Sequence, residues 1–178
     1  MLKVRSRIII VHPGGSEMEL IIANRILQDP LFREKLAKIE RLEEDRIFCG
    51  HGLEHLLSVG RMAMLMCIEK GVEVSPDVLY SAALLHDIGR VEEYTLGISH
   101  DISGPETAGK ILEQVGCDPE DSQQILRLIA GHRHKDPDPL SLEAIFYAAD
   151  KKSRMCSFCK AQEECCWPDE KRNHSIEV

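Results

Sequence analysis

The stretch Leu84-Leu85-His86-Asp87-Ile88-Gly89-Arg90 decides which fold this sequence predicts. It lies at the end of an apolar helical run and places a His-Asp pair just before a glycine, a residue that often ends a helix. The imidazole nitrogen and the carboxylate oxygen of such a pair can bind or bridge manganese, iron or zinc ions. Because a two-residue match is common by chance, the pair needs support from the rest of the chain.

Further side chains with the same ligand atoms lie before and after the pair. One lies upstream in an amphipathic run, and the others follow downstream. All can be placed on expected helices or at their ends, which would let them converge. These side chains are His55, His100, His132 and Asp150. His51 and His134 lie close to them in sequence and are expected to support the ligands or to face solvent.

The composition favours one all-α domain. The chain has 178 residues, which is enough for a buried core, and aromatic residues make up only 4% of it. The formal net charge of -8 argues against binding of nucleic-acid polymers, which requires a basic surface. No apolar run is long enough for a membrane span or a signal peptide, so we expect a cytoplasmic protein without a membrane partner.

Start and stop signals predict a series of helices. We expect them from Ser16 (with Glu19 as a capping box) to about Gln28, from Asp29-Pro30, from Leu53 to Lys70, from Ser75-Pro76 into His86-Asp87, from a Ser103/Glu106 capping box to Gly116, from Asp118-Pro119 to His132, and from Ser141 through Asp150 to Arg154. The stretches 91–102, which contains His100, and 135–139 are expected to be loops. Residues 8–11 could form a short strand or part of a helix.

The C-terminal tail contains a cysteine pattern that can bind metal. Cys156 and Cys159 are separated by two residues, Cys165 and Cys166 follow, and Cys49 precedes the helix of His55. In a reducing compartment, seven cysteines indicate metal binding or packing more than disulfides. One hypothesis is a structural zinc site or an iron-sulfur cluster held by Cys49, Cys156, Cys159 and Cys165. The alternative is a set of free thiols or a redox-sensitive pair.

The ordered motifs resemble those of the HD-domain metal-dependent phosphohydrolases over roughly residues 51–154. They are Glu54-His55-Leu56-Leu57-Ser58-Val59, Ala82-Ala83-Leu84-Leu85-His86-Asp87-Ile88-Gly89, His100 with Gly104, and Tyr147-Ala148-Ala149-Asp150-Lys151. The resemblance implies an all-helical bundle with a central metal cleft. We therefore divide the chain into an N-terminal helical region (1–48), an HD core (49–155) and a cysteine-rich tail (156–178).

The resemblance also implies a ligand set. His55, His86, Asp87 and Asp150 would hold a first ion, and His100 and His132 would hold a second, with Asp87 as a bridge. Six ligands of this kind resemble the branch that hydrolyses diadenosine tetraphosphate. The N-terminal helices, the tail and the His132-Arg133 pair depart from that branch, and a Cys-x-x-Cys…Cys-x-Trp tail is similar to that of some small bacterial HD proteins.

The chemistry expected of such a site is hydrolysis of a phosphoester or phosphoanhydride by a metal-activated water, with one or two iron or manganese ions. Asp87 would act at the metal, and the negative charge of a phosphoryl group needs cations, which Arg90, Arg133 and Lys151 could supply. For Arg90 a surface ion pair is an equal alternative. The expected partner is a small phosphorylated substrate such as a nucleotide, and the sequence leaves a homodimer open.

Two other classes of protein fit the same residues. The first is a regulatory protein that binds a nucleotide at the helical site without turnover, while its cysteines respond to redox or metal state. The second, weaker alternative is a structural helical protein whose ligands are vestigial. Hydrolysis by the metal-loaded protein, and its loss on substitution of Asp87, would distinguish the enzyme from both.

Overall fold

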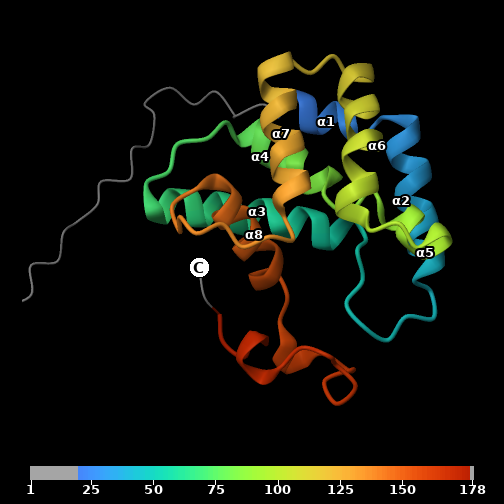
Figure 1. Cartoon of the computed structure of the whole chain (residues 1–178), viewed down its shortest axis with the longest axis vertical. Helices are drawn as coiled ribbons and strands as arrows, with labels where there is room; N and C mark the ends of the chain where they lie inside the picture. Colours follow the sequence, from blue (N-terminus) through green and yellow to red (C-terminus); the bar gives the residue numbers. More distant parts are fainter. Residues whose placement is uncertain (1–19, 177–178) are drawn as a thin grey trace, which may run out of the picture.

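The computed structural model describes residues 20–176, in which helices form a bundle and the C-terminal tail lies beneath it (Figure 1). Within these residues no strand occurs, so the predicted all-α fold is confirmed. The helices are α1 (Ile21–Ile26), α2 (Pro30–Leu42), α3 (Leu53–Lys70), α4 (Pro76–Leu85), α5 (Arg90–Leu96), α6 (His100–Gln114), α7 (Pro119–Gly131) and α8 (Leu142–Lys152), followed by 3-10 turns at Cys156–Phe158 and Asp169–Lys171.

Several helices begin and end where local signals predict. The Asp29 carboxylate accepts a hydrogen bond from the amide of Phe32 at 2.9 Å at the start of α2. The Ser141 hydroxyl accepts one from Ala144 at 3.1 Å at the start of α8. Gly71 ends α3 with a φ of 68°, a backbone conformation that favours glycine.

Helix α4 lies at the centre of the packing, in contact with α1, α3 and α7. Helix α3 also packs against α8, and α7 also packs against α6 and α8. The interior is mainly aliphatic, with Phe32 and Phe146 as its fully buried aromatic side chains. This arrangement brings the end of α4 between the beginning of α3 and the ends of α7 and α8, where the candidate ligands lie.

Asp77, in the first turn of α4, caps a different helix. Its two carboxylate oxygens accept hydrogen bonds of 2.8 Å from the amides of Ile22 and Ala23 at the start of α1. The first amides of a helix have no partner within it, and a carboxylate also suits the positive end of the helix dipole. Asp77 therefore fixes α1 to the helix that leads into His86-Asp87.

The prediction for residues 91–102 is wrong. This stretch contains most of the short helix α5, and α6 begins at His100, before the proposed Ser103/Glu106 capping box. The α6 helix continues through Pro105, and the Ser103 hydroxyl donates to the carbonyls of Ser99 and Gly89 from within it. The Ser-Gly-Pro sequence resembles a helix start, but here it lies in the second turn.

Two other boundaries also differ from the prediction. Leu20 is not helical, so α1 begins at Ile21, and the proposed capping box of Ser16 and Glu19 lies outside the described residues, as do residues 8–11. The last helix ends at Lys152, with Ser153 as its cap, before Arg154. None of the described helices combines the length and apolar character that a membrane-spanning helix requires.

Candidate metal centre

Five helices bring the candidate ligands to one buried place. His55 lies in the first turn of α3, His86 and Asp87 directly follow α4, and the other three come from the start of α6, the end of α7 and the last turn of α8. The six side chains are largely inaccessible to solvent: His55, His86, Asp87, His100, His132 and Asp150. They converge although they span almost a hundred residues of sequence.

A first group of ligand atoms surrounds one oxygen of Asp87. Its Oδ2 atom lies 3.0 Å from Nε2 of His86 and 3.4 Å from Nε2 of His55. Oδ1 of Asp150 lies 3.2 Å from the His55 nitrogen and 3.8 Å from that of His86. Nitrogen and carboxylate oxygen are the ligand types that iron, manganese and zinc accept, so these atoms could hold a divalent ion.

A second group surrounds the other oxygen of Asp87. Oδ1 lies 3.4 Å from Nε2 of His100, and that nitrogen lies 3.0 Å from Nε2 of His132. The donor atoms of these three residues all lie within 4.8 Å of one another. Asp87 is therefore common to both groups, with one oxygen directed to each.

Hydrogen bonds to the other ring nitrogen orient these histidines. Nδ1 of His86 donates to the carbonyl of Ala83 at 2.8 Å, and Nδ1 of His132 donates to the carbonyl of Ile129 at 2.5 Å. Nδ1 of His100 contacts the carboxylate of Glu93 at 2.8 Å. Because a carbonyl or carboxylate oxygen only accepts, Nδ1 carries the proton, and in the neutral ring Nε2 presents its lone pair to the centre.

The unsatisfied atoms fit a bound cation. Nε2 of His86 is fully buried and has no hydrogen-bond partner. The Nε2 atoms of His100 and His132 face each other at 3.0 Å with two lone pairs, an arrangement that a positive charge between them would stabilise. Since buried polar atoms in proteins are nearly always satisfied, the donor set is suited to metal ions.

The charges of the centre agree with this interpretation. Burial opposes ionisation of Asp87 and Asp150, but their histidine neighbours hold the pKa of both carboxyl groups well below the usual range. Burial also opposes a charge on His86, yet the two carboxylates raise its pKa to about 10. At neutral pH this ring therefore carries a proton on Nε2, which a metal ion bound there would displace. Burial and the nearby His86 lower the pKa of His132 to about 3, which keeps this ring in its neutral, metal-binding form.

Gly89 allows the second group to form. Its φ of -76° is ordinary, so it is not needed for a left-handed turn. A Cβ atom at this position would lie 2.5 Å from the carbonyl oxygen of His100 and 2.6 Å from the amide nitrogen of Gly104. The absence of a side chain lets the start of α6 approach the His-Asp pair, which brings His100 next to Asp87.

The three predicted cations have different positions. Nε of Arg90 lies 3.0 Å from Oδ1 of Asp87, and its Nη1 lies 2.8 Å from Glu93, so Arg90 forms the ion pairs of the alternative hypothesis beside the centre. The Lys151 ammonium pairs with Asp150. Arg133 is more exposed and contacts Ser99 and Asp101, and its Nη1 lies 3.8 Å from Glu93, the carboxylate that contacts His100.

The structure also shows functional candidates that the sequence did not indicate. Both the amide and Nδ1 of buried His51 bind the carboxylate of Glu43, which also accepts a hydrogen bond from the Tyr94 hydroxyl at 2.5 Å. Nη2 of Arg154 donates to Nε2 of His55 at 3.1 Å, and its Nη1 donates to the carbonyl of Gly50 at 3.1 Å. These contacts join distant segments, and no local pattern predicts them.

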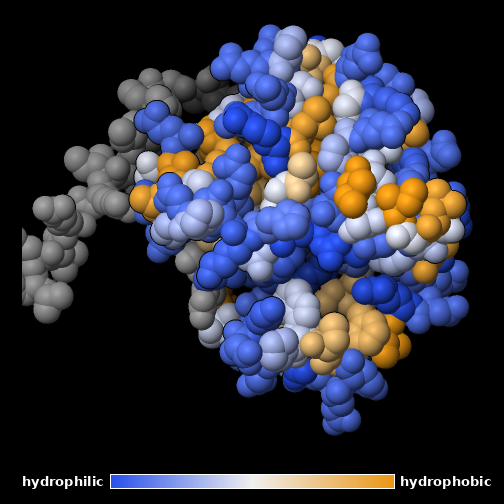
Figure 2. Space-filling model, viewed as in Figure 1, coloured by the Kyte–Doolittle hydropathy of each residue, from blue (hydrophilic) through white to orange (hydrophobic). Residues whose placement is uncertain are grey.

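The proposed cysteine site is only partly assembled. Cys49, Cys156, Cys159 and Cys165 line one cavity together with Cys166. Within residues 20–176, however, no group of three ligand atoms at metal-binding separation includes a cysteine sulfur. The cavity has a volume of about 400 Å³, and Asp150 of the metal centre also lines it. Figure 2 shows the hollow between the tail and the helices above it.

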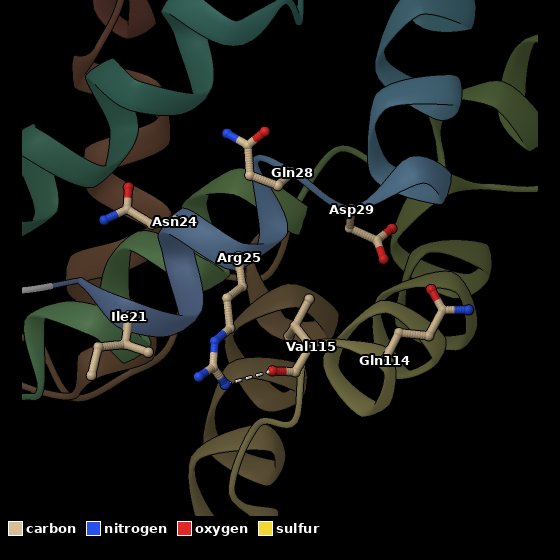
Figure 3. A pocket seen from close by; sticks show the side chains of 7 residues that line it. All are labelled: Ile21, Asn24, Arg25, Gln28, Asp29, Gln114 and Val115. Atoms are coloured by element: carbon tan, nitrogen blue, oxygen red, sulfur yellow. Dashed lines mark hydrogen bonds between the residues drawn. The ribbon is translucent and has the colours of Figure 1, made fainter.

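A second cavity lies away from the metal centre, between α1 and the end of α6 (Figure 3). Arg25 crosses it and donates to the carbonyl of Val115 at 3.0 Å, so this side chain serves to join the two helices. None of the six candidate ligands lines this cavity.

Comparisons with known proteins agree with the fold and with the position of the centre. A protein of Clostridium beijerinckii that carries the name "Uncharacterized protein" is 38% identical over 153 residues, which cover 86% of this chain and 96% of that protein. Ribonuclease Y of Clostridium botulinum is 32% identical over 116 residues, which cover 65% of this chain. Ribonuclease Y of Petrotoga mobilis is 33% identical over 97 residues, which cover 54% of it.

The alignments with ribonuclease Y cover only 20% and 17% of those proteins. No solved structure matches the chain. The model of the HD domain family matches residues 52–155, the part that contains all six candidate ligands. The chain therefore belongs to the HD domain family, whose members are generally metal-dependent phosphohydrolases.

Proposed function

We propose that this protein hydrolyses a small phosphorylated compound, such as a nucleotide, with two divalent ions held by the six ligands. The observation that carries the proposal is the position of Asp87, whose two oxygens face two separate groups of histidines. Bound ions would supply the Lewis acidity that activates water and stabilises charge on a phosphoryl group. Iron and manganese are the proposed ions, and the nitrogen and carboxylate oxygen ligands suit both of them.

The side chains around the ligands are placed to exclude water, to bind phosphoryl oxygens or to position Asp87. Burial of the ligand side chains excludes bulk water, which strengthens every charge interaction in the centre. Lys151 and Arg154, which contact Asp150 and His55, are placed to bind phosphoryl oxygens at the mouth of the centre. Arg90 is paired with Asp87 and Glu93, so we assign it the positioning of Asp87. Arg133 lies 3.8 Å from Glu93, the carboxylate that contacts His100, so we propose for it a weaker, electrostatic role at the edge of the centre.

The size of the adjacent cavity supports a small substrate. A volume of about 400 Å³ lies within the range of small-molecule sites in proteins, roughly 300–1,000 Å³. The similarity to ribonuclease Y adds phosphodiesters to the substrates that should be tested, but it covers only the HD part of that protein. With a net charge of -8, we do not expect a long nucleic acid to be the partner.

A screen of the metal-loaded protein would test the proposal. The protein, purified without oxygen, would be loaded with Mn²⁺ or Fe²⁺ and offered nucleoside mono-, di- and triphosphates, dinucleoside polyphosphates, bis(p-nitrophenyl) phosphate and a short RNA. We expect turnover of at least one small phosphate, two ions per chain, and a loss of at least about 100-fold in Asp87→Asn. The control is Asp136→Asn, in the exposed loop after α7.

The absence of turnover on the whole panel, or full activity in Asp87→Asn, would refute hydrolysis at this centre. It would favour a second candidate, a nucleotide-binding sensor, because five cysteines line the cavity beside Asp150. In that case the thiols would bind a soft metal or a cluster, or would be oxidised. A structural metal at these cysteines predicts that Cys159→Ser loses one metal equivalent while the ions at His86 and Asp87 remain. Equal metal content in the two proteins would exclude it.

A further inference from the structure

The cavity beside the metal centre, which we call the tail cavity, is closed by the cysteine-rich tail. The loop between α2 and α3 and the end of α8 form its inner wall. Residues of the tail, from Cys156 to Arg172, form the outer wall. Asp150 belongs both to this lining and to the candidate ligands, so the tail cavity opens directly onto the metal centre. Figure 1 shows the tail beneath the bundle, and the space-filling view of Figure 2 shows the hollow between them.

Basic side chains outnumber acidic ones in the lining of the tail cavity, although the chain as a whole is acidic. Four arginines and one lysine line it, and Asp150 is the only carboxylate among the lining residues. These cations are Arg46, Arg90, Lys151, Arg154 and Arg172. Three of these cations are ion-paired: Arg90 with Asp87 and Glu93, Lys151 with Asp150, and Arg172 with Asp169. Arg46 and Arg154 instead donate to the backbone carbonyls of Cys49 and Gly50, so among the described residues they supply the unpaired positive charge. A cavity with this excess of positive charge attracts an anion.

The charges are concentrated toward the metal centre. Arg154 reaches Nε2 of His55 at 3.1 Å, and the Lys151 ammonium lies against Asp150. A phosphate bound between these two cations would lie next to the ligand groups. The remaining part of a bound molecule would then extend toward the tail, where Trp167 and several cysteine side chains form a less polar wall.

The tail wall is held in place by specific hydrogen bonds. The Asn173 side chain donates to the carbonyls of Lys151 at 2.6 Å and Arg154 at 2.8 Å, which fastens the tail to the end of α8. The Arg172 guanidinium donates to the carbonyls of Trp167 at 2.9 Å and Cys165 at 3.1 Å, which fixes the loop that carries the tryptophan. Trp167 is therefore part of a built wall.

We propose that the tail forms the specificity subsite of the metal centre and that Trp167 stacks on a flat aromatic ring attached to the phosphate, while Arg154 binds the phosphate itself. This inference rests on the proposed function, because it assigns the part of the substrate that does not react. A nucleoside monophosphate unit has this chemistry, with an anion at one end and a planar base at the other. Stacking of a base on an aromatic side chain contributes about 1–3 kcal/mol.

The only tryptophan of the chain makes a direct test feasible. Adenosine 5'-monophosphate, ribose 5-phosphate and adenosine would be titrated into the full-length, metal-free protein, followed by Trp167 fluorescence and by calorimetry. We expect saturable quenching by the nucleotide, which should bind at least about 10-fold more tightly than ribose 5-phosphate, the difference that one stacked base supplies.

Variants separate the two contacts. By calorimetry, Trp167→Leu should bring the affinity for the nucleotide down to that for ribose 5-phosphate. Arg154→Ala should lower the affinity for both of these phosphate compounds at least about 10-fold. Arg127→Ala, an exposed arginine on α7 outside the tail cavity, is the control and should bind as the wild type does. Thermal unfolding of each variant would show that the fold is intact.

Equal binding of the nucleotide and ribose 5-phosphate by the wild type would overturn the inference, as would an unchanged preference in Trp167→Leu. Zinc added to the metal-free protein that binds the cysteines and blocks nucleotide binding would also overturn it. These results differ from failure of the proposed function. Binding with base preference but without turnover would support the tail subsite and refute hydrolysis, whereas turnover without base preference would do the opposite.

Discussion

Replacing Gly89 with alanine should separate the two ligand groups. The new Cβ would lie 2.5 Å from the carbonyl oxygen of His100 and 2.6 Å from the amide nitrogen of Gly104, and both atoms belong to the backbone of α6. Ordinary contact requires about 3.5 Å, so the start of α6 must move by roughly 1 Å. His100 would move with it, away from Asp87, from which its Nε2 now lies 3.4 Å.

The expected cost of Gly89→Ala is about 1–3 kcal/mol in the free energy of unfolding, the range for overpacking of a buried site. Urea denaturation would measure it, and Mn²⁺ titration by calorimetry would count the ions. We expect the ion at His55, His86 and Asp150 to remain while the affinity of the second ion falls.

The matched control is Gly109→Ala in the same helix. A Cβ at Gly109 has no neighbour within 4 Å, so this change should stabilise α6 by about 0.5–1 kcal/mol. The prediction is that Gly89→Ala lowers the free energy of unfolding and Gly109→Ala raises it. If Gly89→Ala were as stable as Gly109→Ala and bound both ions as tightly as the wild type, the close approach of α6 would not be what places His100.

Three further predictions concern stability. Asp29→Ala removes the cap on the amide of Phe32 and should lower the free energy of unfolding by about 1 kcal/mol in urea denaturation. Mn²⁺ at 100 times its dissociation constant should stabilise the fold by about 2.7 kcal/mol, and EDTA should reverse the rise in Tm; a Tm that does not respond would argue against the metal centre. Burial raises the pKa of Glu43, but hydrogen bonds from His51 and Tyr94 outweigh it and lower this pKa from 4.5 to about 2. The stabilisation is therefore present above pH 4.5 and is lost as the pH falls toward 2. Glu43→Gln should remove about 1–2 kcal/mol of this acid-dependent stability, measured by urea denaturation from pH 6 to 2.

Much of the helical fold could be predicted from short sequence signals. Asp29-Pro30, Ser75-Pro76 and Asp118-Pro119 each begin a helix as predicted, because the proline restricts its own φ and the preceding residue is extended. Gly71 ends α3 for an equally local reason. Such signals depend on a few neighbouring residues, so distant parts of the chain rarely override them.

The same signals failed where tertiary contacts determine the backbone. The hydroxyl of Ser103 donates to the carbonyl of Gly89, 14 residues earlier. Only a glycine fits at position 89, because the backbone of α6 lies against it. The sequence predicted a glycine that ends a helix, whereas the structure shows a glycine that admits another helix. A contact of this kind leaves no periodic pattern in the sequence.

In the candidate site, the ligands could be predicted from the sequence, whereas the contacts around them could not. The order of the six ligands predicted a common centre, and the structure brings five of them together in two groups that share Asp87, with Asp150 beside the first group. The contacts that hold the ligands and their neighbours in place could not be predicted. Glu43 and Tyr94, which are 51 residues apart in sequence, meet beside His51, and Arg154 contacts His55 although the two are 99 residues apart. These contacts depend on how α2 packs against α5 and how α8 packs against α3.

The carboxylate of Asp77 has a consequence for the order in which the chain folds. It holds the first amides of α1, which lie 54 and 55 positions earlier in the sequence. A helix of six residues is too short to form on its own, so α1 should appear only after α4 has provided this partner. The helix that leads to the His-Asp pair is thus the template for the first helix of the described chain. In native-state hydrogen exchange, the amides of Ile22 and Ala23 should become exposed whenever the start of α4 opens.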